Sequence, residues 1–158
     1  MPDSEITITI EGLNEMRSNI ERWPAIYNEA KMNLFNSWGF AVEGQAKYYV
    51  PVDTGFLRSS ISVAVGIGQD SVQVGPNAYY GPFVEFGTKP HFPPVAPLAL
   101  WARRHGMPGG GFALALAISR YGTPPQPYMI PAFEQVNRER LPRFLEEFSA
   151  DLVKGFNS

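Results

Sequence analysis

A β-hairpin pattern in the first half of the chain constrains the fold more than any other feature. The stretch "SISVAVGI" at 60–67 and the stretch "SVQVG" at 71–75 both alternate apolar and polar residues. The intervening "GQD" is typical of a tight reversal. The alternation passes through Ile61, Val63, Val65 and Ile67, then Val72 and Val74. These residues predict a small antiparallel sheet with one buried face.

A second alternating stretch opens the chain. In "EITITIEG" at 5–12, Ile6, Ile8 and Ile10 point to one side and the polar residues to the other. This period of two is typical of a half-buried strand. Gly12 ends the predicted strand.

Helical periodicity appears on both sides of the sheet region. Pro24 suits a first helical position, and apolar residues then recur at helix spacing to about Tyr49. A final helix is predicted from about 132 to 156, where Pro142 should kink or divide it. The fold class is therefore predicted as α+β, a small antiparallel sheet packed against two long helices.

The region from 88 to 127 differs from the rest of the chain in its many proline and glycine residues. Two helix-like pieces, "APLALWARRHG" and "GFALALAISRYG", are separated by "MPGGG" and flanked by "KPHFPP" and "TPPQPYMIP". Each piece ends in glycine, which commonly terminates helices. We expect a helical hairpin at 94–121, within a Pro/Gly-flanked insertion at 88–127 of a single domain spanning 1–158.

Composition removes several classes of function. The 158 residues include no cysteine, which excludes disulfides, thiolate metal sites and a cysteine nucleophile. The net charge is −2 and only Arg103-Arg104 hints at a basic face, so stable binding to naked nucleic acid is not expected. The longest apolar run, "FALALAI", is too short to span a bilayer, and the N-terminus lacks a leader pattern.

The tripeptide Asp53-Thr54-Gly55 raises the question of catalysis. Aspartic proteases present a catalytic carboxylate in this tripeptide, and a chain with one copy must dimerise so that two carboxylates share a proton. Here the motif follows an apparent helix end, the bulky Phe56 follows the glycine, and no Gly-Arg-Asp or Gly-Arg-Asn occurs. A homodimeric aspartic protease using Asp53 remains as an alternative.

The structural interpretation makes the same motif a corner between a helix and the sheet. The Asp53 carboxylate can accept hydrogen bonds from backbone amides and cap a short turn. Gly55 supplies a permissive backbone and Leu57 can enter the core. Glu85 lies in an aromatic block, where a buried carboxylate needs a partner, and we expect a structural salt bridge with Arg58.

Three motifs in order resemble a known family. They are "PVDTGFLRSSI" at 51–61, "YYGPFVEFGT" at 79–88 and "QPYMIPAF" at 126–133. With a terminal helix, they make the chain similar to the minor tail or tail-completion (head–tail joining, neck) family of tailed bacteriophages over roughly residues 5–155. The family usually has Tyr-Ala where this chain has Ala78-Tyr79-Tyr80-Gly81. On this resemblance the motif residues are structural: Asp53, Thr54, Gly55, Leu57, Ser59, Glu85, Gly87, Thr88, Pro127 and Pro131.

The resemblance implies a virion component and not an enzyme. Family members have an α+β fold and take part in finishing the tail or joining it to the head, where copies form a ring around the DNA channel. The expected partners are tail tube, tail terminator or head connector proteins, with passive contact with passing DNA and none with a membrane. The expected location is the virion, and the host cytoplasm during assembly. A small prophage protein that binds a host factor remains a second alternative.

The remaining candidate residues concern binding. His91 and His105 are too far apart, with no ligand partner at fixed spacing, to predict a metal site, and no cofactor is expected. Aromatic residues in or near the proline-rich flanks "KPHFPP" and "TPPQPYMIP" are candidates for contacts with a partner protein, because interfaces favour desolvated aromatic side chains. The candidates for an interface or a DNA channel are Phe92, Trp101, Arg103, Arg104, Tyr121 and Tyr128.

Overall fold

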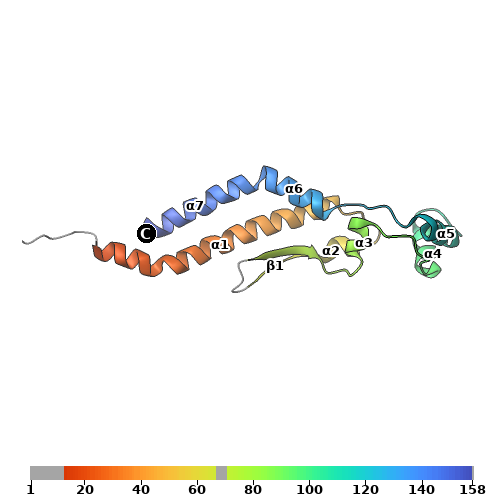
Figure 1. The fold of residues 1–158 in the computed structure, drawn as a ribbon, viewed down its shortest axis with the longest axis horizontal. Coiled ribbons are helices and arrows are strands. Elements are labelled where there is room, and N and C mark those ends of the chain that lie inside the picture. The colour runs from red at the N-terminus through yellow and green to blue at the C-terminus, as the bar shows by residue number, and fades with distance from the viewer. Residues whose placement is uncertain (1–12, 67–70, 158) are drawn as a thin grey trace, which may run out of the picture.

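The computed structural model describes residues 13–66 and 71–157 of the chain. The fold is elongated, with long helices side by side at one end and a helical hairpin at the other (Figure 1). The predicted strand at 5–11, the predicted strand end at Ile67 and the predicted turn at 68–70 lie outside the described residues. The α+β class is confirmed, since the helices accompany one two-stranded antiparallel sheet.

The elements follow one another along the chain with short connections. After the first helix, α1 (Leu13–Tyr49), come the short helix α2 and the strands β1 and β2, then the short α3, the hairpin helices α4 and α5, and the closing pair α6 and α7. Their bounds are Phe56–Ser60 (α2), Ile61–Val65 (β1), Val72–Pro76 (β2), Gly81–Phe86 (α3), Val95–Arg104 (α4), Gly111–Tyr121 (α5), Met129–Glu139 (α6) and Leu141–Asn157 (α7).

The long helix α1 begins at Leu13, so the predicted start at Pro24 was wrong. A proline inside a helix removes one backbone hydrogen bond. Packing against α7 on both sides of the proline offsets this loss: Trp23 meets Phe156 edge to face with ring centroids 6.0 Å apart, and Tyr27 meets Phe148 at 6.2 Å. Tertiary contact therefore extends the helix through a residue that locally disfavours it.

The sheet lies against α1 at a glycine. β1 and β2 pair antiparallel with Val63 opposite Val74 and Val65 opposite Val72. A Cβ atom at Gly39 of α1 would lie 2.7 Å from Val63 Cγ1, closer than side-chain carbons approach one another. The missing side chain lets the valines reach the helix backbone, so Gly39 sets the distance between helix and sheet.

The hydrophobic core is small and lies where α1, the sheet and α6 meet. Its buried members are Ala46, Val50, Leu57, Ile61, Ala78, Tyr128 and Ala132. Most of them are small, and many large apolar side chains elsewhere are exposed. Among residues 13–66 and 71–157, no helix combines the length and apolar composition needed to cross a bilayer.

The closing helix is divided, as predicted for Pro142. α6 ends at Glu139 and α7 begins at Leu141, with Arg140 between them. Pro142 falls in the first turn of α7, where its missing N–H has no helical partner to lose. The predicted single start near 132 was late by three residues.

The helical hairpin expected at 94–121 is present as α4 and α5. The two helices pack through small residues: a Cβ on Gly111 would lie 2.7 Å from Ala99 Cα, and Ala102 and Ala115 are fully buried. This close packing leaves the larger side chains of both helices on the outside. The hairpin projects on two extended segments, 87–94 and 122–128, which we call the stalks (Figure 1). The remaining helices and the sheet form the body of the protein.

Candidate functional site

The Asp53 carboxylate is paired with Arg104 across the space between the body and the hairpin. Arg104 Nε donates to Asp53 Oδ1 at 2.9 Å, and Arg104 Nη2 donates to Oδ2. This paired geometry holds a planar carboxylate against a planar guanidinium. The hydrogen bonds from Arg104 lower the pKa of the Asp53 carboxyl below its ordinary value, and the pairing raises the pKa of Arg104.

The predicted helix cap at Asp53 was therefore wrong. The N-terminus of α2 follows Gly55, which lies in the left-handed region with φ of 83°, and no side chain caps the helix. Only a long contact remains locally, from the backbone N–H of Phe56 to Thr54 Oγ1 at 3.4 Å. A strong cation on α4, 51 positions away, takes the carboxylate that the local backbone would otherwise use.

The corner continues into the core much as the motif suggested. Leu57 is 6% exposed and belongs to the core. Ser59 Oγ donates to the Phe56 carbonyl at 2.9 Å, which satisfies a group within α2. The corner therefore joins α1 to the sheet and also presents Asp53 to the hairpin.

A cleft of about 480 Å³ lies between this corner and the hairpin. The corner residues 51–57 form one wall, and Trp101 of α4 and His105, the residue after α4, lie on the other side with Tyr80 and Gln126. The rings of Trp101 and His105 stack with centroids 4.0 Å apart, and His105 Nδ1 lies 2.9 Å from the Trp101 carbonyl oxygen. The Asp53–Arg104 pair therefore borders a groove with aromatic walls.

Glu85 caps the start of α6. Its Oε2 accepts backbone N–H groups of Tyr128 at 2.7 Å and Met129 at 2.8 Å, and its Oε1 accepts that of Ile130 at 3.0 Å. A buried carboxylate is favourable here because the free N–H groups of a helix start carry partial positive charge. The predicted salt bridge to Arg58 was wrong, since backbone amides take both oxygens.

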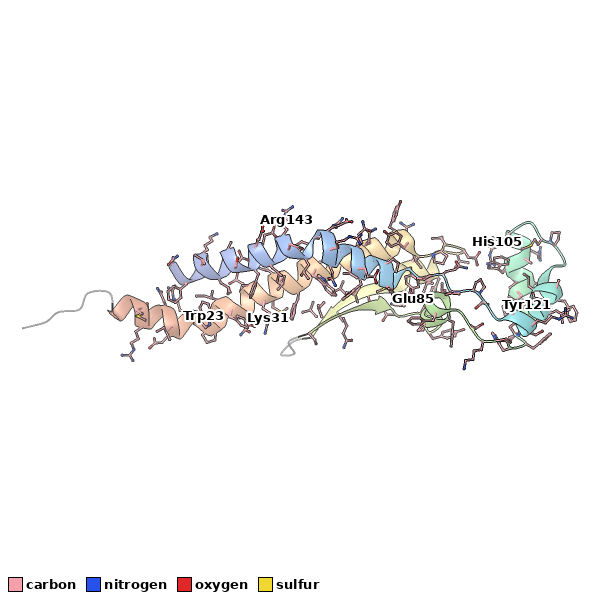
Figure 2. All side chains as sticks on the ribbon, turned by 45° about the horizontal axis from the view of Figure 1, so that its top comes forward. Trp23, Lys31, Glu85, His105, Tyr121 and Arg143 are labelled. Carbon is pink, nitrogen blue, oxygen red and sulfur yellow. The ribbon has the colours of Figure 1, made fainter. Side chains whose placement is uncertain are left out.

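Figure 2 shows Glu85 on the body at the end that faces the hairpin. Pro131 is the third residue of α6, just beyond the three amides that Glu85 accepts, so its missing N–H leaves no bond unmade. Pro127 is exposed and precedes the buried Tyr128. The block "QPYMIP" is thus the segment that enters α6 under the Glu85 cap.

The two stalks of the hairpin are clasped at their base. Thr88 and Thr123 form an isolated antiparallel bridge: the Thr88 N–H donates to the Thr123 carbonyl at 3.1 Å and the Thr123 N–H returns to the Thr88 carbonyl at 3.2 Å. The hydroxyl oxygens of both threonines lie 3.0 Å apart. The preceding residues, Gly87 and Gly122, have φ of 71° and 73°, and any Cβ there would strike the opposite stalk.

The six candidate interface residues differ in exposure and in their partners. Phe92 and Tyr121 are 58% and 81% exposed on the stalk and the hairpin, where Figure 2 shows Tyr121, and the Phe92 ring meets that of Phe112 edge to face with centroids 6.4 Å apart. Trp101 is partly buried against His105, and Arg104 is engaged by Asp53, which leaves Arg103 as the exposed arginine of that pair without a partner among the described residues.

The prediction that Tyr128 belongs to an interface was wrong. Its side chain is fully buried in the core, and its hydroxyl has no hydrogen-bond partner in the described part of the chain. Burial, together with the negative charge of Glu85, raises the pKa of the Tyr128 hydroxyl to about 12. A residue in this position supports α6 from within and does not reach a partner protein.

No metal-ligand cluster occurs in the part of the chain that the structure describes. His91 Nδ1 lies 2.9 Å from the Lys89 carbonyl oxygen, and His105 is stacked on Trp101. The arrangement around Asp53 is that of a fixed ion pair, whose guanidinium stabilises the ionised carboxylate. A carboxylate held this way is a poor proton carrier.

Three contacts of this site were not predicted from the sequence. The Asp53–Arg104 pair, the three amides on Glu85 and the Thr88–Thr123 clasp all join residues that lie far apart along the chain. The one local signal was the pair of glycines that precede threonines, "GT" at 87–88 and again at 122–123.

Comparison with known proteins gives one family match. Residues 14–87 match the model of the HK97-gp10_like family, described as "Bacteriophage HK97-gp10, putative tail-component". The matched segment ends at Gly87, the residue before the clasp, and includes Asp53 and Glu85. Comparisons with the curated proteins and with the solved structures found no match.

Proposed function

Because residues 14–87 form an HK97-gp10-like domain of the bacteriophage tail-component class, we propose that the protein is a structural component of the neck or tail of a tailed phage or prophage. It completes the tail, or joins it to the head, by assembling into a homo-oligomeric ring. The family match carries this proposal. Its expected partners are tail tube, tail terminator or head connector proteins.

The surface of the protein supports assembly. The chain exposes 11392 Å², whereas a compact monomer of 17.5 kDa exposes about 7,900 Å². The seventeen residues outside the described ranges could add about 2,700 Å² at most. The remaining excess is what a subunit with a projecting arm presents before it meets its neighbours.

The hairpin supports the same proposal. Its buried contact uses alanine and glycine, and its large apolar side chains face outward: Phe112 is 61% exposed, Leu100 56% and Leu116 39%. Apolar surface of this kind on an isolated subunit marks contacts with other proteins. Residues 88–127 also contain four Lys or Arg residues and no Asp or Glu, which suits passive contact with passing DNA.

We propose a non-catalytic role for Asp53. In a dimeric aspartic protease two carboxylates share one proton, which requires that one of them is easily protonated. Here the Arg104 guanidinium holds the carboxylate in its ionised form. The pair instead ties the hairpin to the body.

The test is genetic and structural. Particles produced without this protein should show tails that fail to join heads or tails of abnormal length in negative-stain electron microscopy, and the wild-type gene should restore them. Normal particles without the protein, or its capture by a host factor with none in virions, would reject the proposed function.

The hairpin can be tested separately, because Thr88 and Thr123 are hydrogen-bonded partners. Replacing 89–122 with an Asn-Gly turn closes the clasp over a two-residue connection. We expect this variant to fold with an unchanged body and to fail in particle assembly. Loss of folding would show that 88–127 belongs to the core and is not a separable insertion.

A further inference from the structure

The two-stranded sheet has unpaired backbone groups along both of its edges. The Gly66 N–H donates to the Ser71 carbonyl and the Asn77 N–H to the Ser60 carbonyl, which fixes the hydrogen-bonded pairs of the antiparallel ladder. The backbone groups of the intervening residues therefore point outward, among them those of Val63 on β1 and Val74 on β2. Within residues 13–66 and 71–157, no other backbone group bonds to the outward N–H groups of these two strands.

The sheet also has an incompletely covered apolar face. The side chains of Val63 and Val72 reach Gly39 of α1, so this face looks toward the helix. Yet the valines of both strands are only partly buried. Phe40, the next residue of α1, is 60% exposed. A two-stranded sheet with an open face is marginal by itself, and a third strand would complete it.

Phe40 lies on the side of α1 that is turned away from α6. The Trp38 side chain is held toward α6 by its hydrogen bond to Asn137, with Nε1 and Oδ1 2.8 Å apart. Residues two positions apart on a helix lie about 200° apart around its axis. Phe40 therefore faces away from α6 and adds an exposed apolar side chain to α1 next to Gly39.

We propose that residues 5–11 of a second copy of this chain add to one edge of this sheet as a third strand. The segment "EITITIE" alternates in the same sense as the sheet: Ile6, Ile8 and Ile10 would continue the apolar face formed by the valines of β1 and β2. Thr7 and Thr9 would join the outer face, which carries Ser62 and Gln73. Isoleucine and threonine both favour strands.

The same chain cannot supply this strand. Gly39, beside Val63, lies 26 residues after Leu13, or about 39 Å along α1. β1 extends about 7 Å from Val63 toward the start of α1. Five residues before Leu13, Ile8 reaches at most about 18 Å from the helix start. It therefore falls well short of its own sheet.

Such an exchange deepens the proposed ring assembly, on which it rests. Each copy has one donor segment before α1 and one acceptor sheet beside the second half of α1. A donor and an acceptor at different places make a head-to-tail contact, which closes into a ring when the rotation permits. Main-chain hydrogen bonds would give the contact its strength and the isoleucines its register.

Cysteine crosslinking tests the pairing, because the chain contains no cysteine of its own. Thr9→Cys is combined with Gln73→Cys on β2 or with Ala64→Cys on β1, both of which are exposed on the outer face. Oxidation of concentrated protein, and of assembled particles, should give a covalent ladder of multimers with one of the two acceptor sites. Thr9→Cys with Ser149→Cys on α7 should give none.

A second pair of variants tests the face of the strand. Ile8→Asp should abolish the ladder and leave the melting temperature within a few degrees of wild type, whereas Thr7→Asp, its neighbour on the opposite face, should retain the ladder. A disulfide formed within one chain overturns the inference, as does the absence of any ladder in both protein and particles. A ladder from purified protein that never enters particles would reject the proposed function and keep the strand exchange.

Discussion

The Glu85 carboxylate lies 2.7 Å from the backbone nitrogen of Tyr128, although the two residues are 43 positions apart. The whole hairpin region lies between them in the chain. The carboxylate comes from the family-matched segment, and the amides belong to the helix that packs on α1. This one side chain therefore joins α3 to the start of α6, the two points of the body between which the hairpin is inserted.

Removing the Glu85 cap should destabilise the body. Glu85→Ala leaves three amides at the start of α6 without their acceptor in a buried site. We expect the free energy of unfolding to fall by about 2–3 kcal/mol, as for hydrogen bonds to a charged group. Urea denaturation measures the change. Glu134→Ala, an exposed position of the same helix, should stay within about 0.5 kcal/mol of wild type, and equal effects of both changes would contradict the cap.

Breaking the Asp53–Arg104 pair should loosen the hairpin without unfolding the body. Asp53→Asn removes the charge, so we expect faster amide hydrogen exchange in α4 with a melting temperature within a few degrees of wild type. The exchanged pair, Asp53→Arg with Arg104→Asp, should restore slow exchange. A peptidase activity that Asp53→Asn abolishes at unchanged stability would instead support the protease alternative.

Acid should release the hairpin in the same way. Because pairing lowers the pKa of Asp53 in the folded protein, its stabilising effect is complete above the ordinary aspartate pKa of about 4 and is lost as pH falls through the lowered value. The Trp101 indole, beside the cleft, should report opening below about pH 4 as an NMR shift. In Asp53→Asn this shift should be absent, and the same acid transition in both proteins would rule the pair out as its cause.

Alanine should lower the free energy of unfolding more at Gly122, beside the Thr88–Thr123 clasp, than at Gly106, which lies outside it. Gly106 and Gly122 have φ of 72° and 73°, so alanine is strained at both. Only Gly122 has a neighbour in the way, the Thr88 carbonyl oxygen at 2.0 Å from a Cβ. We expect thermal denaturation to show a loss of about 1 kcal/mol for Gly106→Ala and about 3 kcal/mol for Gly122→Ala. Equal losses would mean that the clasp relaxes freely.

The buried Tyr128 hydroxyl should be dispensable. It has no partner, so Tyr128→Phe removes a desolvated polar group and should leave stability unchanged or raise it by about 1 kcal/mol. Because its pKa is raised to about 12, folding loses stability as pH rises from about 10 to 12. Tyr128→Phe should resist alkaline unfolding better than wild type. Tyr79→Phe, at an 87% exposed position, should not, and lower stability of Tyr128→Phe would reveal a partner for the hydroxyl.

Much of the fold could be predicted from the sequence because it depends on short-range patterns. Alternation at 60–75 predicted β1 and β2, and glycine-terminated apolar pieces predicted α4 and α5. Pro142 predicted the break between α6 and α7. The start of α1 could not be predicted in this way, because the contacts of Trp23 and Tyr27 with α7 outweigh the local effect of Pro24.

The amino-acid sequence by itself determined the hairpin strands, the long helices and the helical hairpin, the match of residues 14–87 to a phage tail-component family, and the place of the Asp-Thr-Gly tripeptide at a corner. Only the tertiary structure decided the partners of the two carboxylates. Asp53 bonds Arg104 and not its neighbouring amides, and Glu85 bonds the start of α6 and not Arg58. The reason is physical: local patterns set the backbone conformation of each segment, whereas a carboxylate bonds whichever donors the packing of distant segments brings within about 3 Å of it.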